Sequence, residues 1–479
     1  MDSTLVNFGQ THFGEADLGD ARRTKRLVRV ADRLAAHPAG SLPDKMQSPA
    51  DLAALYHLMN GERVTHASVL APHFRRTRQA ILDHPDPVIL LAHDDTDLDL
   101  TSKHSLKDGL GPLGGKHQRG YICHNSIAST ATGEPLGLAN QILHVNKRRR
   151  KNTPRAVLRE CPHRQSRLWM RGREAIGDFP AGKRVIDLVD RGGDTFEFLD
   201  YEHARHYDYV ARAKSNRAAL VGHQGGDEDE RKIKLFDHLR SLPEAGRRPQ
   251  DVPPRPAKAG EEARPGRDTE LAVAWAAVTL PPPVRSRARG EHRQVPLQLW
   301  AVRVWEPTPP EGAQALEWML LTDVAVEAAA DAWERVGWYE WRWPLMEEFH
   351  KGQKTGCDVE GPQFTTKQAM EPMIGVLSVV AWMLMYLRWA ARDEAKADEP
   401  ASRSVPLGWV LLLSRWRTGQ EQPEWTVREF LLALARLGGH QNRKGDGLPG
   451  WQTLWKGWTK LHAAIQLATP PPPKNWAQR

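Results

Sequence analysis

Two apolar runs, each ending in aspartate, place the strongest constraint on how this chain can fold. Residues 88–95 read VILLAHDD and residues 185–190 read VIDLVD. Apolar runs of this length are typical of strands buried on both faces of a sheet. The second run is followed by a Gly-Gly pair and a helical stretch, and then by a further strand-like segment, YDYVARAK. Strands that alternate with helices predict an α/β core.

The N-terminal part has helical periodicity. Residues 18–38 place one set of side chains on an apolar face, namely Leu27, Val30, Ala31 and Leu34, and one set on a basic face, namely Arg22, Arg26, Arg29 and Arg33. A second helix is predicted to begin at SPADLAALYHLMN, with Ser48 as N-cap, Pro49 at the first helical position and Asp51 completing a capping box. The basic face either meets a polyanionic partner or is an ordinary solvated face.

The length and composition suggest a multidomain protein. At 479 residues the chain is long enough for about three domains. We expect a helical module at 1–68, an α/β domain at 69–390 with a β-rich insertion at about 215–310, and a Trp-rich helical region at 391–479. In that last region Trp451, Leu454, Trp455 and Trp458 follow helical spacing, which favours core or interface packing over a ligand site.

The charge and the cysteine usage narrow the class of protein. The formal net charge of +8 favours a polyanionic partner, although a solvated basic surface also fits. Three Cys without a C-x-x-C pair predict neither a zinc site nor a disulfide framework. The longest apolar run, residues 373–387, is too short to span a bilayer comfortably and predicts a buried helix. We therefore expect a cytoplasmic protein without a membrane partner.

The two strand-end aspartates, Asp95 and Asp190, are candidate metal ligands. Side chains at strand ends of α/β sheets project into the crevice where ligands bind. Neighbouring buried carboxylates need a neutralising cation, and magnesium prefers oxygen ligands. Aspartates at strand ends also serve as turn and capping residues, and spacing alone does not show that these two converge.

A third acid is expected in the helix around WYEWRWPLMEEFHKGQKTG. Glu347, Lys351 and Lys354 lie at i, i+4 and i+7 on one face, which by itself describes a surface Glu–Lys ladder. The same stretch carries four aromatic residues that indicate burial: Trp338, Trp341, Trp343 and Phe349.

These residues carry a resemblance to a known family. Tyr339, Arg342, Glu347 and Lys354, followed by TG, resemble the Y-R-E-K signature of bacterial cut-and-paste DDE transposases, the insertion-sequence family that includes the transposase of the kanamycin-resistance composite transposon. Further segments resemble the family in the same order along nearly the whole chain: ADLGDARRTKRLV, HDDTDLDL, VIDLVDRGGD, EWMLLT, ALARLGG and GWQTLWKGW.

The resemblance implies a ribonuclease-H-like mixed-sheet core with a β-strand insertion before the last acid. It implies that Asp95, Asp190 and Glu347 bind two Mg²⁺ ions, which Mn²⁺ can replace. The family cuts transposon ends through a hairpin intermediate and joins the 3′ hydroxyl to target DNA. It works as a homodimer that pairs two ends, in the bacterial cytoplasm and on the nucleoid when bound to DNA.

The resemblance also assigns DNA contacts. Tyr339, Arg342 and Lys354 would contact the backbone near the cut, and Trp318 would stack against a flipped base, unless the alternation in EWMLLT simply buries it. In the N-terminal module, Arg22, Arg23, Arg26 and Arg29 could neutralise phosphates.

One departure from the family pattern affects the third acid. Four residues rather than three separate Arg342 from Glu347, and the strict count falls on Met346, which cannot bind magnesium. We assign Glu347 and expect the helix to begin near Pro344, so that the extra residue precedes it; Glu348 is the competing ligand. Two other functions remain open: a non-catalytic DNA-end-binding descendant, and a related nuclease without strand transfer.

Overall fold

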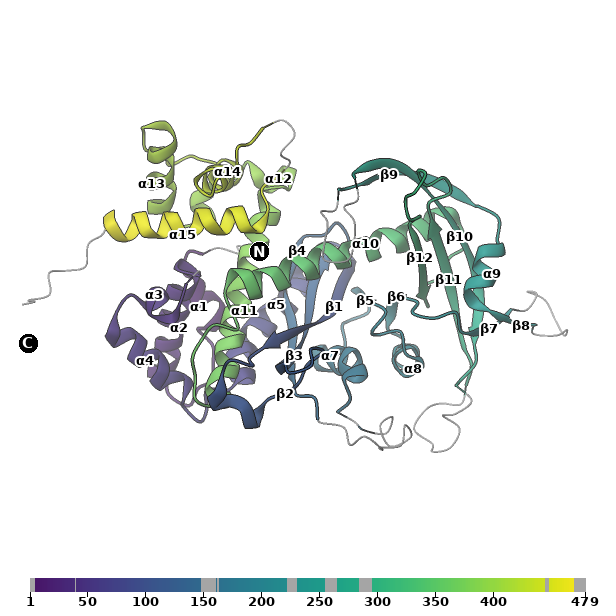
Figure 1. Cartoon of the computed structure of the whole chain (residues 1–479), viewed down its shortest axis with the longest axis horizontal. Helices are drawn as coiled ribbons and strands as arrows, with labels where there is room; N and C mark the ends of the chain where they lie inside the picture. Colours follow the sequence, from purple (N-terminus) through teal and green to yellow (C-terminus); the bar gives the residue numbers. More distant parts are fainter. Residues whose placement is uncertain are drawn as a thin grey trace, which may run out of the picture.

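A mixed β-sheet flanked by helices forms the centre of the molecule (Figure 1). The computed structural model describes residues 5–38, 40–147, 161, 163–221, 231–254, 265–283, 295–443 and 448–468. Within these residues the strands join into one 12-stranded sheet. The chain is therefore a mixed α/β protein.

Five strands form the part of the sheet that holds the candidate acids. Three of them, β1 (Val88–Asp99), β3 (Arg119–Thr130) and β4 (Pro135–His144), pair antiparallel. Two more run parallel to β1, namely β5 (Arg184–Val189) and β6 (Asp208–Arg212). The spatial order is β4-β3-β1-β5-β6. The connecting helices are α7 (Leu168–Ile176) and α8 (Phe196–Arg205), and the short β2 (Gly111–Pro112) pairs with β3.

The remaining strands extend this sheet rather than forming a separate one. β12 (Glu317–Thr322) pairs antiparallel with β6 and continues into β11 (Leu297–Trp305) and β10 (Arg267–Leu280). The outer elements are β7 (Ala218–Val221), β8 (Arg231–Lys234), α9 (Leu235–Ser241) and β9 (Gly246–Val252). Residues 222–230, 255–264 and 284–294 of the expected insertion lie outside the described residues.

Alternation along the central strands assigns helices to the two faces of the sheet. Leu90, Ile186 and Val210 pack in one buried cluster with residues of α10 (Ala329–Lys351). Ile89 and Leu91 pack in another cluster with α5 (His66–Asp83) and the end of α7. Because neighbouring residues of a strand point to opposite faces, α10 covers one face and α5 and α7 cover the other.

The N-terminal helices are α1 (Phe8–Phe13), α2 (Ala21–Ala36), α3 (Leu42–Met46) and α4 (Pro49–Met59). The apolar face predicted for α2 is confirmed, because all four of its assigned residues are buried. Ser48 caps α4 and accepts from the Asp51 amide at 3.4 Å. The Asp51 carboxylate does not complete a capping box. It pairs with Arg33 at 2.7 Å and Arg26 at 3.8 Å, because these basic residues face α4.

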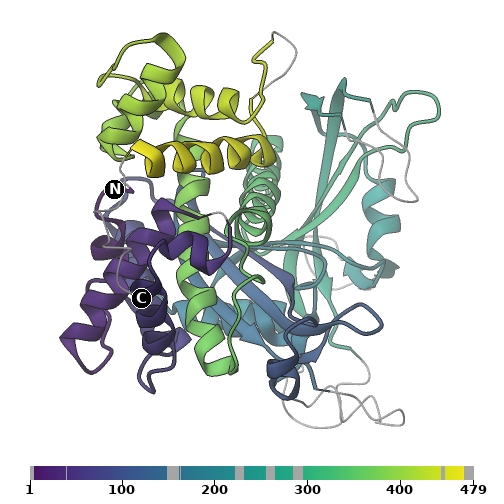
Figure 2. The same cartoon turned by 60° about the vertical axis from the view of Figure 1, so that its left-hand side comes forward.

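The N-terminal helices share one hydrophobic core with helices from the far end of the sequence. The shared cluster contains Leu27, Leu70, Trp382 and Leu434. α11 (Lys367–Ala390) stands beside the N-terminal helices in both views (Figures 1 and 2). It is long and apolar enough to span a membrane, but 94% of its most apolar window is buried inside the protein. The described residues between 5 and 68 therefore pack as part of the larger body.

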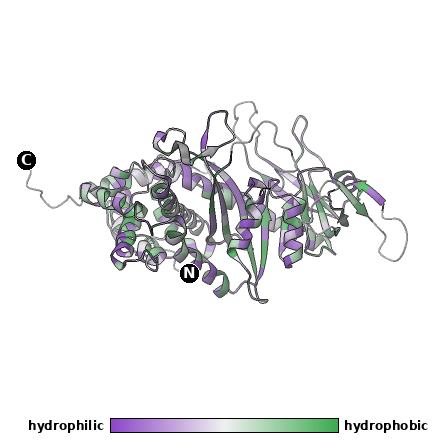
Figure 3. Ribbon diagram, turned by 90° about the horizontal axis from the view of Figure 1, so that it is seen from below, coloured by the Kyte–Doolittle hydropathy of each residue, from purple (hydrophilic) through white to green (hydrophobic). Residues whose placement is uncertain are grey.

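The C-terminal helices are α12 (Glu394–Ala397), α13 (Leu407–Thr418), α14 (Val427–Leu437) and α15 (Trp451–Ala468). Hydrophobic and hydrophilic residues alternate along the helices and strands (Figure 3). Trp451, Leu454 and Trp458 are buried, and the Trp458 ring meets the Trp409 ring edge-on at 5.7 Å. The prediction that this stripe serves packing is confirmed.

The start expected for the helix that carries Glu347 was wrong. α10 begins at Ala329, fifteen residues earlier, and Pro344 lies inside it. The buried side of α10 packs on the sheet along its whole length, and Pro344 sits on the exposed side, where one lost backbone hydrogen bond is tolerated. Arg342 and Glu347 therefore belong to one continuous helix. Five residues at about 100° each place them roughly 140° apart around its axis.

Candidate active site

Three aspartates gather where β1 and β5 part. The pairing between these strands ends at Ala92 and Leu188, so that Asp94 and Asp95 lie past its end and Asp190 follows β5 directly. Burial raises the pKa of Asp190, the charges of Asp94 and Asp95 raise it further, and Arg342 opposes them. The arrangement holds more negative charge than it neutralises, which is typical of a cation site or an active site.

Asp94 and Asp95 point in opposite directions. Asp95 lies across from His124 in the β1–β3 register, and His124 Nδ1 is 2.7 Å from Asp95 Oδ1. Asp94 faces α10, where its Oδ2 is 3.2 Å from Nη1 of Arg342. The sequence showed both acids in HDDTD but not their faces. The roles of Asp94 and His124 were missed, because only the strand register reveals them.

Tyr339 and Arg342, expected at the DNA backbone, are both 6% exposed. The Arg342 guanidinium lies 5.8 Å from the centre of the Tyr339 ring and faces the aspartates. Lys354 lies in the π-turn after α10, where its Nζ donates to the Asp97 carbonyl at 2.7 Å and pairs with Glu360 at 3.1 Å. α10 therefore brings Arg342, but not Lys354, into direct contact with the acid cluster.

The two candidate third acids have different partners. Glu347 pairs with Lys351 at 2.9 Å, and its side chain is 38% exposed. Glu348 is held by Arg388 and by Arg392, the latter at 3.3 Å. Met346, the residue at the strict family spacing, is buried. Glu347 is thus paired with one exposed lysine, whereas Glu348 is paired with two arginines. Turning toward a metal ion would therefore break fewer ion pairs at Glu347 than at Glu348.

The half-buried imidazole of His350 on α10 feels the charges of acids on both β1 and α10. The pKa of His350 falls to about 4 because of burial, while the charges of Asp95 and Glu347 act against that fall. The ring is thus neutral at pH 7, and its Nε2 accepts from Asn125 Nδ2 at 3.2 Å. Asp95 and Glu347 are therefore within electrostatic reach of the same ring.

The chemistry of the acids fits a cation only in part. The surplus negative charge at Asp190 and Asp95 suits a divalent ion with oxygen ligands. Across the described residues, however, no group of three or more His, Cys, Asp or Glu side chains is arranged to hold a metal. Asp190 is within electrostatic reach of Asp94 and Asp95, and Glu347 would have to leave Lys351 to join them.

An aromatic pocket adjoins the acids. Trp318 of β12 is half-buried, and its ring meets the Tyr339 ring edge-on at 6.3 Å. The pocket has a volume of about 1090 Å³ and its lining includes Trp318, Trp338, Trp341, Trp343 and Arg342. Flat indole faces beside a guanidinium suit an unpaired nucleobase and its phosphate.

The four predicted arginines of α2 differ in exposure. Arg22 is 91% exposed in its side chain and pairs with Asp20. Arg29 is also exposed. Arg23 Nη1 donates to the Leu18 carbonyl at 3.1 Å, and Arg26 pairs with Asp51. Arg22 and Arg29 are the best placed to meet a phosphate.

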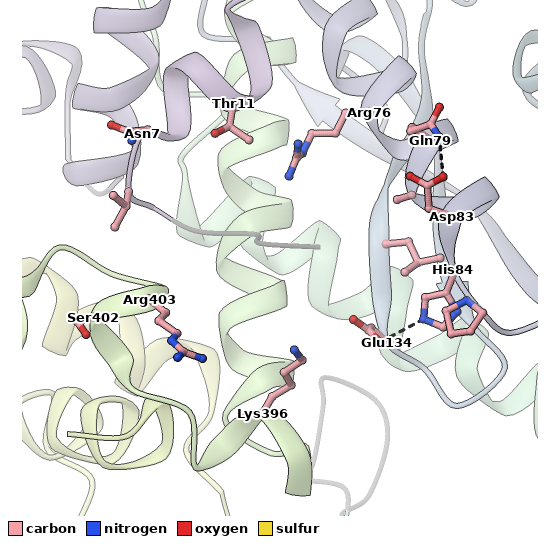
Figure 4. Close-up of a pocket in the computed structure, with 14 residues that line it drawn as sticks. Asn7, Thr11, Arg76, Gln79, Asp83, His84, Glu134, Lys396, Ser402 and Arg403 are labelled. Atoms are coloured by element: carbon pink, nitrogen blue, oxygen red, sulfur yellow. Dashed lines mark hydrogen bonds and ion pairs between the residues drawn. The ribbon is translucent and has the colours of Figure 1, made fainter. Parts of the chain in front are cut away.

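A second cavity of about 1210 Å³ lies between the N-terminal helices, the β3–β4 turn and the segment after α11. Arg76, Lys396 and Arg403 point into it (Figure 4). On its other side, Gln79 donates to Asp83 at 2.7 Å, and His84 faces Glu134 at 3.6 Å. None of the candidate acids lines this cavity.

The comparison with known families concerns the N-terminal helices. Residues 7–64 match the family model described as transposase DNA-binding. This transposase DNA-binding segment contains α1 to α4 and the arginines of α2. The match supports a transposase and supports DNA as a partner.

Proposed function

We propose that the protein is a DDE-type DNA transposase that cuts transposon ends through a hairpin and joins them to target DNA. The observation that carries the proposal is the electrostatic coupling of Asp190 to Asp94 and Asp95, where the pairing of the parallel strands β1 and β5 ends. It occurs in a chain whose N-terminal segment matches a transposase DNA-binding family.

The core is proposed to be ribonuclease-H-like. The strand order β4-β3-β1-β5-β6, with three antiparallel strands followed by two parallel to β1, supports this assignment. So does the position of the added strands, which lie in the sequence between β6 and the helix that carries Glu347.

The proposed acids are Asp95, Asp190 and Glu347, which would hold two Mg²⁺ ions or Mn²⁺ in their place. Bound divalent ions would activate the attacking water or hydroxyl and stabilise the leaving oxygen of the phosphodiester. Arg342, Tyr339 and Lys354 would hold the DNA backbone near the cut, and Trp318 would receive the base expelled when the hairpin closes. The arginines of α2 would bind the ends, and residues 391–479 would pair two copies of the chain.

One observation favours a second candidate, a DNA-end-binding descendant without catalysis. Glu347 is paired with Lys351 and lies five residues after Arg342 on a continuous helix. In that position it is turned away from the face that carries Arg342.

The test uses full-length protein, Mg²⁺ and duplex DNA carrying the inverted repeats that flank its own coding region. Asp95→Ala, Asp190→Ala and Glu347→Ala should each abolish cleavage and leave the gel shift intact. Cleavage by Asp190→Ala would overturn the proposal. Binding without cleavage by the wild type would identify the non-catalytic descendant, and cleavage without joining would identify a nuclease.

A further inference from the structure

The imidazole of His124 is fully buried beside Asp95. The two residues are direct partners across the antiparallel β1–β3 pair, so their side chains share one face of the sheet. His124 Nδ1 lies 2.7 Å from Asp95 Oδ1, and the Asp95 side chain is 13% exposed. The second oxygen, Oδ2, lies 3.3 Å from Gln165 Nε2. Asp95 thus has one oxygen, Oδ1, bonded to the buried His124, and the other, Oδ2, near Gln165.

Rings on both sides hold His124 in place. The ring of His93 stacks on it at 5.7 Å with an interplanar angle of 20°. His93 is itself fixed by Asp187 Oδ1 at 2.7 Å and Ser126 Oγ at 2.9 Å. Trp169 of α7 meets the His124 ring edge-on at 5.5 Å. The ring therefore has little freedom to turn away from Asp95.

Gly172 of α7 provides the space on the remaining side. A methyl group at this position would lie 2.7 Å from His124 Nε2 and 3.0 Å from its Cδ2. Glycine inside a helix costs about 1 kcal/mol relative to alanine, and the approach of the imidazole explains its use here. His124 Nε2 is buried and has no hydrogen-bond partner among the described residues. Nδ1 is therefore expected to carry a proton and donate it to the Asp95 carboxylate.

We infer that His124 is a positioning residue that fixes the orientation of the Asp95 carboxylate, and that Gly172 keeps its ring in place. The inference rests on the proposed function, in which Asp95 is a catalytic acid. Partners that orient metal ligands contribute about 10- to 100-fold to metal affinity or activity when removed. A loss of that size is expected when the hydrogen bond from Nδ1 is removed.

Two amide substitutions separate the hydrogen bond from simple packing. In His124→Asn the amide nitrogen takes the place of Nδ1, and in His124→Gln it takes the place of Nε2. We expect His124→Asn to retain Mg²⁺-dependent cleavage within a few-fold of wild type. We expect His124→Gln to lose about 10- to 100-fold in cleavage rate and in Mn²⁺ affinity measured by calorimetry. Melting temperatures report any general loss of packing.

Gly172→Ala tests the space for the ring. It should reproduce the loss seen in His124→Gln, and it should cause no further loss in the His124→Asn background, where the ring is gone. Gly182→Ala is the matched control, because a Cβ added at this glycine, in the turn before β5, meets nothing within 4 Å. It should leave both cleavage and Mn²⁺ affinity unchanged.

The outcomes separate this inference from the proposed function. A wild-type protein without cation-dependent cleavage overturns both. If the wild type cuts and His124→Gln cuts and binds Mn²⁺ equally well, only the positioning role is overturned. Equal losses in His124→Asn and His124→Gln, matched by equal falls in melting temperature, would reduce His124 to a packing residue. Additive effects of Gly172→Ala and His124→Asn would overturn the role of Gly172.

Discussion

Arg342 Nη1 lies 3.2 Å from Asp94 Oδ2 and joins α10 to the middle of β1. The side chains of Arg342 and Asp94 are 7% and 23% exposed. Breaking a buried pair costs about 3–5 kcal/mol, and the partial exposure of Asp94 places this pair at or below the lower end. Arg342 opposes the burial that raises the pKa of Asp94, and among the described residues neither Asp95 nor Asp190 has an ion pair with lysine or arginine.

We therefore predict that Asp94→Asn lowers the free energy of unfolding, measured with urea, but retains Mg²⁺-dependent cleavage. Asp95→Asn should abolish cleavage with a smaller loss of stability, since Asn keeps an oxygen for His124. Cleavage that survives in Asp95→Asn and disappears in Asp94→Asn would identify Asp94 as the first acid.

Ionisation of Asp190 should lower the free energy of unfolding as the pH rises from acid to neutral. Burial and the neighbouring acids raise its pKa in the folded state above the unfolded value of about 4. Stability is then lost as the pH rises from about 4 through the folded pKa. Asp190→Asn removes this loss, so it should unfold at higher urea than wild type at pH 7, and the difference should vanish near pH 4.

Asp323 provides the control for that experiment. Burial and Asp208 raise its pKa to about 7, and its Oδ1 accepts from the Tyr209 amide at 3.1 Å. Asp323→Asn should also stabilise the protein above pH 7, but it should leave cleavage intact. Equal loss of cleavage in both variants would show that Asp190 acts through the fold.

Removal of Glu347 and removal of Glu348 should have opposite effects on cleavage and on stability. Glu347→Ala breaks only an exposed i,i+4 pair with Lys351, so stability should change by less than about 0.5 kcal/mol while cleavage is lost. Glu348→Ala leaves Arg388 and Arg392 without their carboxylate, so the melting temperature should fall while cleavage per folded molecule persists. The reverse pattern of cleavage would show that Glu348 is the third acid.

Trp318→Ala should slow hairpin formation and resolution but spare the first nick. Stacking of a base on an aromatic ring contributes about 1–3 kcal/mol, equivalent to roughly 5- to 150-fold in rate. Quenched-flow kinetics on a labelled transposon end would separate the steps. Trp305→Ala is the control, because Trp305 is also half-buried but lies on β11 against Arg303. Equal slowing of all steps, with a fall in melting temperature, would make Trp318 a core residue.

Binding of transposon ends should weaken steeply with salt through the exposed arginines of α2. Arg22→Gln and Arg29→Gln should each reduce the log–log salt slope by about 0.9 for every phosphate that the arginine no longer neutralises. Arg26 is a poor choice for this test, because its substitution also disturbs Asp51. Arg415→Gln on α13, also well exposed, should leave the slope unchanged. Unchanged slopes in the α2 variants would mean that these arginines do not bind phosphates.

Local patterns were enough to predict much of the fold. Alternation predicted the buried side of α2 around Leu27, and the apolar runs predicted β1 and β5. β5 ends directly before Asp190 as expected, but the strand end expected at Asp95 was wrong, because pairing with β3 carries β1 on to Asp99. The start of α10 could not be predicted in this way, because packing against the sheet outweighs the helix-breaking tendency of Pro344. The hydrogen bond between Asp95 and His124 could not be predicted either. It depends on the register between β1 and β3, and the residues that connect these strands show no sequence pattern from which that register follows.

The core shared between the N-terminal helices and α11 has a consequence for the order of folding. About 300 residues of sequence separate α4 from α11, whose side chains complete the cover of Leu27 and Leu70. At a synthesis rate of about 5–20 residues per second, that interval corresponds to roughly 15–60 s on the ribosome. The DNA-binding helices therefore reach their final packing only after the strands that hold both aspartates have been made, and release of a half-made chain would yield a segment with its apolar side open to water.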